Sequence, residues 1–175
     1  MLKPGDAAPS FDLPCAFDDR ISHVSLEGIR SEMVVVFFYP HDFSFVCPTE
    51  VIGFHKLQPA FKQEHTSIVG ISIDDAESHR RWARELGGLS YPLVADVDGK
   101  LARAFGAFDE SDRAAMRAAF VLDRRRTITY AVASSINVGR SVSEILRVVR
   151  ALRTGRECPA DWQPGELTGP NEPQY

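Results

Sequence analysis

A cysteine between an apolar segment and a helix is the residue in this sequence best placed to do chemistry. Cys47 lies in the stretch FYPHDFSFVCPTE, residues 38–50, and directly precedes Pro48. Because proline favours the first position of a helix, we expect Cys47 at the N-cap and Glu50 at the third helical position. Free backbone N–H groups and the helix dipole would then stabilise a thiolate, the nucleophilic form of cysteine. The alternative is an inert cysteine buried at a strand-to-helix junction.

Two neighbours of Cys47 favour a pocket for a small polar substrate. Pro40 lacks an N–H group and can form a wall of the pocket, whereas the hydroxyl of Ser44 can both donate and accept a hydrogen bond. A peroxide requires both functions, because the attacked oxygen is held while the leaving oxygen gains negative charge. These residue types make Cys47 a candidate nucleophile toward the O–O bond of a peroxide.

The composition narrows the class of protein. The chain has 175 residues, a net charge of −4 and three cysteines, Cys15, Cys47 and Cys158, without a CxxC motif. An odd number of separated thiols disfavours a disulfide framework, a structural zinc site and a thioredoxin-type redox pair. The acidic charge and the absence of a long apolar run argue against nucleic-acid binding and membrane insertion. No secretory signal is evident, so we expect a cytoplasmic protein, and we interpret Cys15 as structural.

The apolar pattern predicts an α/β fold whose elements follow a thioredoxin-like order. Uninterrupted apolar segments predict buried strands, and a charged turn between two further segments predicts an antiparallel hairpin. The expected strands cover residues 33–39, 67–73, 91–95, 118–122 and 127–133. Helices are expected over residues 48–62, 76–86, 100–105 and 141–152, with Asp74-Asp75 and a Ser141/Glu144 capping box at two of their starts.

The same pattern predicts a single domain with two extensions. An extended arm, residues 3–13, lies before the first strand, and residues 1–153 form a central mixed sheet flanked by helices. Residues 154–175 are rich in proline and glycine, so we expect a tail that belongs to the same domain.

The stretch around Cys47 resembles the active-site signature of peroxiredoxins, in the typical two-cysteine branch of alkyl hydroperoxide reductase C and thioredoxin peroxidase. The resemblance continues, in the family's order, through GISIDDAESHRRWARELGGLSYPLVADVDGKLARAFG, RAAFVLDRRRTIT, INVGRSVSEILRVVRAL and ECPADWQPGE. It implies a thioredoxin-like fold, a peroxidase activity toward hydrogen peroxide and small organic hydroperoxides, and a C-terminal tail that carries a resolving cysteine.

The resemblance assigns roles to both cysteines and to the pocket. Cys47 matches the peroxidatic cysteine, and Cys158 matches the resolving cysteine, which attacks the sulfenic acid of the partner subunit. Pro40 and Ser44 match the proline and threonine or serine of the pocket, where threonine is the commoner residue. Because a disulfide requires Cα atoms about 4.4–6.8 Å apart, we infer that the first turn around Cys47 unwinds during turnover.

Three charged residues complete the site that the resemblance implies. Arg117 matches the arginine that stabilises the thiolate and orients peroxide, although Ala118 follows it where the family usually has glycine. Glu50 and Arg140 match the pair that supports this arginine. A guanidinium group near a thiolate favours the charged form and donates to a developing oxyanion.

The resemblance also implies partners, and the sequence departs from it in two places. No metal or organic cofactor is implied; the expected partners are a thioredoxin-like or flavoprotein reductant and a second subunit, in a homodimer often assembled into a decamer. Ser90 replaces the last glycine of a Gly-Gly-Leu-Gly motif linked to over-oxidation, and the chain ends in GPNEPQY without a Tyr-Phe helical extension. We therefore expect a loose tail and an enzyme that resists over-oxidation.

Three alternatives stay open at this point. A thiol–disulfide oxidoreductase on the same fold would need a second cysteine between Pro40 and Pro48, where the sequence has one. A holdase chaperone would depend on the apolar surface of a large oligomer. A one-cysteine peroxidase would use Cys47 without Cys158.

Overall fold

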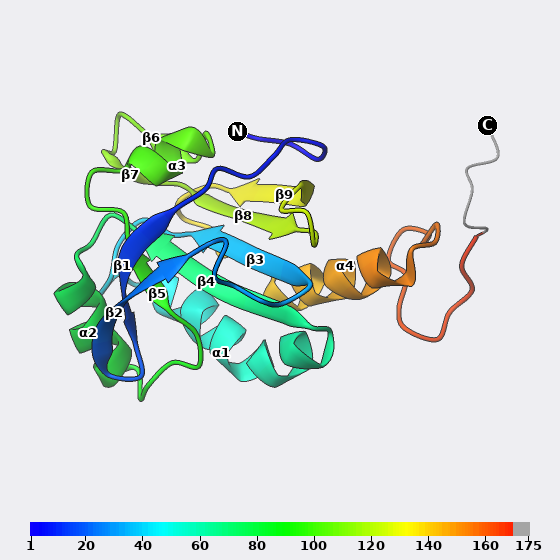
Figure 1. Ribbon diagram of the computed structural model, residues 1–175, viewed down its shortest axis with the longest axis horizontal. Helices are drawn as coiled ribbons and strands as arrows, with labels where there is room; N and C mark the ends of the chain where they lie inside the picture. The colour runs from blue at the N-terminus through cyan, green and yellow to red at the C-terminus, as the bar shows by residue number, and fades with distance from the viewer. Residues whose placement is uncertain (170–175) are drawn as a thin grey trace.

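A mixed sheet forms the centre of the fold (Figure 1), and the computed structural model describes residues 1–169. The strands of this sheet are β1 (Asp12–Phe17), β2 (Arg20–Ser25), β3 (Met33–Phe38), β4 (Thr66–Ser72), β5 (Leu93–Ala95), β8 (Arg117–Leu122) and β9 (Ile128–Ser134). Their order across the sheet is β2-β1-β5-β4-β3-β8-β9. The pairs β3–β4 and β4–β5 are parallel and the other neighbours are antiparallel, which confirms the predicted mixed sheet.

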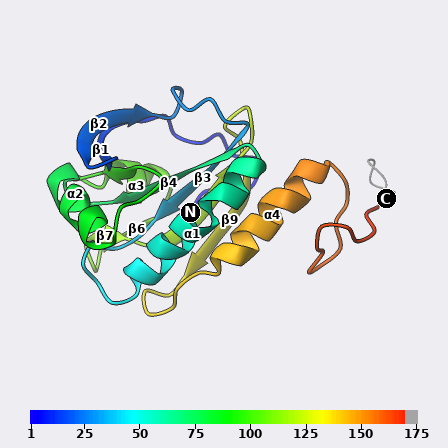
Figure 2. The same cartoon turned by 90° about the horizontal axis from the view of Figure 1, so that it is seen from below.

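Helices cover the sheet. They are α1 (Cys47–Gln63), α2 (Ala76–Glu85), α3 (Lys100–Ala104) and α4 (Val142–Thr154). Figure 2 shows α1 and α4 side by side beneath the sheet. Val142 packs against Gly53 in the first half of α1, and Arg150 binds Glu64 just beyond its end. The two helices therefore run in the same direction, so their C-terminal ends lie together.

Strand β3 is buried on both faces, as its uninterrupted apolar sequence predicts. Val34, Val36 and Phe38 belong to one hydrophobic cluster, on the side of α3. The alternate residues Val35 and Phe37 belong to the opposite cluster, which includes the apolar residues of α1 and α4. Side chains of successive strand residues point to opposite faces, so a central strand needs apolar residues at every position. The carboxyl end of this strand leads directly into the segment that carries Cys47.

The expected N-terminal arm is present, but it is followed by a hairpin that the sequence analysis did not predict. Gly5 N–H donates to Ile128 O at 2.9 Å and Ala8 N–H donates to Arg126 O at 2.9 Å, so the arm lies along the start of β9. Strands β1 and β2 pair as an antiparallel hairpin that the sequence pattern did not reveal. Strand β2 lies at the edge of the sheet and is mostly exposed, so it carries no apolar run. A small second hairpin, β6 (Phe108–Asp109) with β7 (Ala114–Ala115), was also not expected.

The predicted capping residues of α2 and α4 lie where the sequence placed them, with one correction at α4. The Asp75 side chain accepts the Ser78 N–H at 2.7 Å, as a capping residue should. Ser141 Oγ accepts the Glu144 N–H at 3.2 Å, but the Glu144 carboxylate binds Arg147 at 2.6 Å and 2.7 Å. The expected capping box is therefore only half formed, because an arginine one turn later offers two charged donors to the carboxylate.

The tail begins where α4 ends at Gly155, whose φ of 62° is the left-handed conformation typical of a helix C-terminus. Arg147 Nη1 donates to Trp162 O at 3.2 Å, and the Trp162 side chain is buried, so the tail folds back onto α4. The domain boundary at residue 153 stays a prediction. The expected looseness of the last residues concerns positions 170–175, which lie outside the described residues.

Candidate active site

Cys47 is the first residue of α1 and not its N-cap, so the expectation was wrong by one position. Val46 is the N-cap, with an unusually helix-like backbone (φ −88°, ψ −39°), and Glu50 is consequently the fourth helical residue. The Cys47 N–H donates to Ser44 Oγ at 3.3 Å. The sulfur nevertheless belongs to the first helical turn, where the positive end of the helix dipole acts.

Arg117 brings a guanidinium group to the sulfur of Cys47. Its Nη1 atom lies 3.3 Å from Cys47 Sγ and donates to Glu50 Oε2 at 2.8 Å. Its Nε atom donates to Ile136 O at 2.7 Å, which fixes the plane of the guanidinium group. Arg117 is 3% exposed and begins β8, the neighbour of β3 in the sheet. A charge held this far from water interacts strongly with an adjacent thiolate.

Glu50 is held between Arg117 and a second buried arginine. Arg140 binds the Glu50 carboxylate through its backbone N–H and its Nε at 2.7 Å each, and through Nη2 at 3.0 Å. Burial by itself would raise the pKa of Glu50, but hydrogen bonds and charge from Arg140, with the charge of Arg117, lower the pKa below its ordinary value of 4.5. Glu50 is therefore an anion that balances one of the two arginine charges.

The segment between β3 and α1, residues 41–46, is the active-site loop. Pro40 precedes it and is buried, while Ser44 is half-buried on it. Phe43 has a φ of 55°, a conformation that side chains other than glycine rarely adopt, and Phe45 is 94% exposed. Cys47 itself is 0% exposed, so its sulfur is shielded from solvent in the folded chain. Pro40, Ser44, Cys47, Glu50, Arg117 and Arg140 thus lie at one end of the sheet, where β3 ends and β8 begins.

Comparison with known proteins agrees with this geometry. The model of the AhpC/TSA family matches residues 4–131. A putative peroxiredoxin of Synechocystis is 37% identical over 99% of this chain and 92% of its own length, and the chloroplastic 2-Cys peroxiredoxin BAS1 of spinach is 35% identical over 97% and 68%. The chain belongs to the AhpC/TSA family of peroxiredoxins.

Solved structures of this family have the same fold as the peroxiredoxin described here. The reduced 2-Cys peroxiredoxin of Plasmodium vivax is 29% identical, with a TM-score of 0.89 over 96% of this chain and 93% of that chain. AhpC of Mycobacterium tuberculosis is 31% identical, with a TM-score of 0.84 over 93% and 99%. The peroxiredoxin is thus an oxidoreductase of the thiol peroxidase class with a thioredoxin-like fold.

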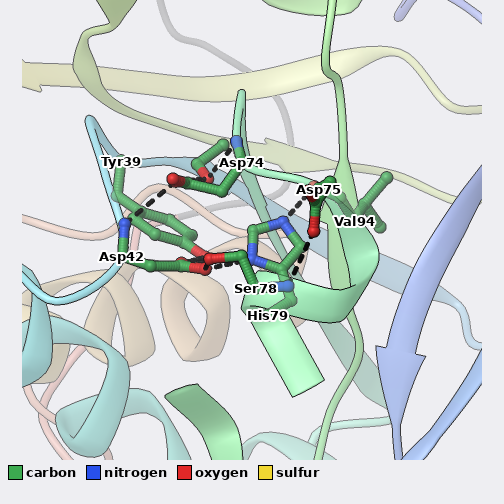
Figure 3. Close-up of polar contacts among 8 residues, drawn as sticks. Tyr39, Asp42, Asp74, Asp75, Ser78, His79 and Val94 are labelled. Carbon is green, nitrogen blue, oxygen red and sulfur yellow. Dashed lines mark hydrogen bonds and ion pairs between the residues drawn. The ribbon is translucent and has the colours of Figure 1, made fainter. Parts of the chain in front are cut away.

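A buried polar cluster in this peroxiredoxin anchors the active-site loop (Figure 3). Asp42 accepts from Tyr39 Oη at 2.8 Å and from Ser78 Oγ at 2.8 Å, and its carboxylate lies 2.9 Å from His79 Nδ1. The backbone N–H of Asp42 donates to Asp74 Oδ2 at 2.9 Å. The start of the loop is therefore tied to α2 and to the turn before it.

Sequence reasoning did not identify this cluster. The only signal is a histidine on the buried face of α2, since His79 is 0% exposed. Its Nε2 atom lies 3.1 Å from Val94 O, so both ring nitrogens face oxygen atoms. Burial and the adjacent charge of Asp42 raise the pKa of Tyr39 well above its ordinary value of 10.0, so the phenol keeps its proton and donates. The cluster rigidifies the loop and is not in contact with the sulfur of Cys47.

Cys158 lies far from Cys47 within one peroxiredoxin chain. Its Sγ atom lies 3.4 Å from Thr154 Oγ1 and 3.7 Å from Ala151 O, at the C-terminal end of α4. Cys47 opens α1, whose 17 residues at 1.5 Å each correspond to about 26 Å. Because α1 and α4 run in the same direction, the two thiols lie at opposite ends of this helix layer. They cannot meet inside one folded chain.

The remaining cysteine lies outside this site. Cys15 is buried in β1, with its Sγ 3.3 Å from Ser22 Oγ. Within residues 1–169, no three His, Cys, Asp or Glu side chains gather in a way that could hold a metal ion. None of the helices in that range has the length and apolar character needed to cross a bilayer.

Proposed function

We propose that this peroxiredoxin reduces hydrogen peroxide and small organic hydroperoxides through a sulfenic acid on Cys47, which Cys158 of a partner subunit resolves. The observation that carries the proposal is the contact of 3.3 Å between Arg117 Nη1 and Cys47 Sγ. A buried guanidinium group at this distance can donate to the sulfur and to the oxygens on which negative charge develops during its attack.

In the first step the Cys47 thiolate attacks one oxygen of ROOH. An S–O bond forms, the O–O bond breaks, and the leaving RO⁻ takes a proton to become ROH. Arg117 donates to the oxygens as charge develops on them, and the Ser44 hydroxyl holds the attacked peroxide. Pro40 closes the pocket without offering a competing N–H group. Sulfur supplies the electron pair and becomes a sulfenic acid.

Glu50 and Arg140 act on this step through Arg117. The carboxylate of Glu50 holds Arg117 Nη1 at 2.8 Å, and Arg140 holds the other side of the same carboxylate. An arginine fixed at both its Nη1 and its Nε atoms does not have to reorganise when charge moves onto the peroxide.

In the second step the Cys158 thiol of a partner subunit attacks the sulfenic sulfur. An S–S bond forms, the S–O bond breaks, and water leaves. The parallel arrangement of α1 and α4 supports a bond between subunits, because one chain holds its two thiols at opposite ends. The proposed form of the enzyme is a homodimer, either alone or as the unit of a decamer.

In the third step an external dithiol regenerates both cysteines by thiol–disulfide exchange, in which the reductant itself becomes a disulfide. A thioredoxin-like protein or a flavoprotein disulfide reductase is the proposed reductant. A cytoplasmic location belongs to the same proposal, because a reducing compartment keeps such dithiols available.

Three serine variants test this function. Peroxide consumption with a dithiol reductant should disappear in Cys47→Ser and persist in Cys15→Ser. After one equivalent of peroxide, non-reducing electrophoresis should show a dimer band that Cys158→Ser abolishes. Peroxidase activity that survives in Cys47→Ser would reject the proposal. A fully active Cys158→Ser variant that recycles without a dimer band would instead establish the one-cysteine mechanism, and suppression of aggregation by Cys47→Ser would favour a chaperone.

A further inference from the structure

His55 in α1 and Ser90 before β5 form a contact that the proposed cycle does not use. The Ser90 N–H donates to His55 Nδ1 at 3.2 Å, and Ser90 Oγ lies 3.0 Å from the same nitrogen. A backbone N–H can only donate, so Nδ1 is the acceptor and the ring proton resides on Nε2. The Ser90 hydroxyl then donates to Nδ1 as well. Both side chains are half-buried, so the contact is partly shielded from water.

A second contact joins the same segment to α1 one turn earlier. Tyr91 Oη donates to Val51 O at 2.7 Å, and Tyr91 is 3% exposed. Burial, with the nearby charge of Glu50, raises the pKa of Tyr91 well above 10.0, so the donor proton stays in place. We call the contacts Tyr91–Val51 and Ser90–His55 the α1 clasp. The clasp holds the second and third turns of α1, beyond the turn that contains Cys47.

The backbone of α1 is weak immediately after the clasp. Pro59 lies inside the helix and has no N–H, so His55 O lacks its helical donor four residues later. Helix unwinding that started at Cys47 and passed His55 would therefore meet a turn that is already short of one hydrogen bond. The clasp therefore contacts α1 at His55, the residue whose carbonyl lacks a helical hydrogen-bond donor.

We infer that His55 and Ser90 are positioning residues that confine the unwinding of α1 to the turns around Cys47. This inference rests on the proposed function, in which Cys47 leaves its helical position to meet Cys158. Ser90 is also the residue at which the sequence departs from the Gly-Gly-Leu-Gly pattern, and a glycine there would have no hydroxyl to donate. Through this contact Ser90 opposes the resistance to over-oxidation that the sequence pattern led us to expect. The clasp thus sets how often and how far Cys47 is released.

The expected consequence is a competition on the sulfenic acid of Cys47. While α1 is wound, a second peroxide can convert the sulfenic acid to a sulfinic acid, with release of ROH. Once the helix opens, Cys158 captures the same sulfur as a disulfide. A weaker clasp should therefore increase the disulfide and decrease the sulfinic acid, without altering the first reaction with peroxide.

Hydrogen–deuterium exchange of the reduced full-length protein tests the clasp directly. Ser90→Ala and His55→Leu should accelerate amide exchange in residues 51–58 by roughly 2- to 10-fold, the effect of losing one or two hydrogen bonds. His55→Asn should stay close to the wild type, because asparagine places an acceptor oxygen where Nδ1 lies. Ser111→Ala, which removes a hydroxyl bound to Asp109 on a distant turn, is the matched control.

The two His55 variants separate the clasp from simple helix propensity. Leucine forms helices better than asparagine, so propensity alone predicts the stronger protection in His55→Leu. Protection in His55→Leu equal to or above that of His55→Asn overturns the inference. Rapid-quench mass spectrometry of the same proteins should show a disulfide rate about 2- to 10-fold higher in Ser90→Ala and an unchanged sulfenic acid rate. If the wild type forms no disulfide, the proposed function is wrong. The hydrogen–deuterium exchange data would still show whether the clasp stabilises α1.

Discussion

Arg117 Nη1 lies 3.3 Å from Cys47 Sγ, although 70 positions separate the two residues in the chain. Strand β8 brings Arg117 beside the carboxyl end of β3, and α1 starts a few residues after that end. The contact therefore exists only when the sheet is complete. A charged donor and the sulfur reach each other through the fold, not through local sequence, so reactivity at Cys47 reports on the integrity of the sheet.

Replacement of Arg117 should slow the reaction with peroxide far more than any later step. We expect Arg117→Ala to reduce the rate of sulfenic acid formation by roughly 100- to 1,000-fold, the usual effect of removing a donor to developing oxyanion charge. Arg117→Lys should recover part of the rate, because the charge returns without the planar fork of donors. Stopped-flow measurement of peroxide reduction checks both. Arg103→Ala, which breaks an ion pair with Glu110 on the surface, is the control and should react as the wild type does.

Neutralisation of Glu50 should destabilise the protein in a pH-dependent way. Glu50→Gln leaves two buried guanidinium groups without an anion, and we expect about 3–5 kcal/mol lower free energy of unfolding at pH 7. The pKa of Glu50 is lower in the folded chain than in the unfolded chain, so its stabilising contribution is present above the unfolded value, 4.5, and disappears as the pH falls through the folded value. Urea denaturation at pH 7 and at pH 3 should show the difference between variant and wild type shrinking at the lower pH. A constant difference would contradict this role of the charge.

Removal of the Tyr39 hydroxyl should loosen the active-site loop. Tyr39→Phe takes a donor away from the buried carboxylate of Asp42, at an expected cost of about 1–3 kcal/mol in the free energy of unfolding. Because the pKa of Tyr39 is raised in the folded state, this stabilisation is complete below pH 10 and is lost as the pH rises through the folded pKa. Thermal and urea unfolding at pH 7 measure the cost. The half-buried Tyr130, changed to phenylalanine, is the matched control and should lose less.

Pro59→Ala should stabilise the protein without changing the resolution step. The substitution restores a donor to His55 O, and we expect the free energy of unfolding to rise by about 1–2 kcal/mol after the extra freedom of the unfolded chain is included. While the clasp is intact, unwinding stops before this turn, so the rate of disulfide formation should change less than about 2-fold. In the His55→Leu background the same substitution should slow disulfide formation again. Rapid-quench mass spectrometry of the four proteins measures this coupling, and an equal effect of Pro59→Ala in both backgrounds would contradict it.

The central elements could be predicted from the sequence because they are buried on both faces. Strand β3 needs apolar residues at every position, so its sequence Met33–Phe38 is an unbroken signal. Strand β2 has no such signal, because its edge position leaves most of its residues exposed. The start of α1 was placed one residue late, since Val46 already has helical backbone angles and no side chain marks it as a cap.

The candidate site was predicted unevenly for a similar reason. Cys47, Pro40 and Ser44 lie within one short stretch, so spacing and residue type point to them directly. Arg117 and Arg140 became candidates only through the resemblance to peroxiredoxins, because an isolated arginine carries no signal of its own. Asp42 and His79, 37 positions apart, were missed, since only the packing of α2 against the sheet brings them together. The His55–Ser90 contact was missed for the same reason.

The shared direction of α1 and α4 has a consequence for how the enzyme behaves on dilution. A lone subunit under the proposed cycle would consume one peroxide and then stop. Its own Cys158 lies at the end of the helix layer opposite Cys47 and cannot resolve the sulfenic acid. Turnover would therefore depend on protein concentration in the range where subunits separate, and the first oxidation would not. Each catalytic cycle under this proposal can be completed only by an assembled subunit, because the disulfide forms with a partner.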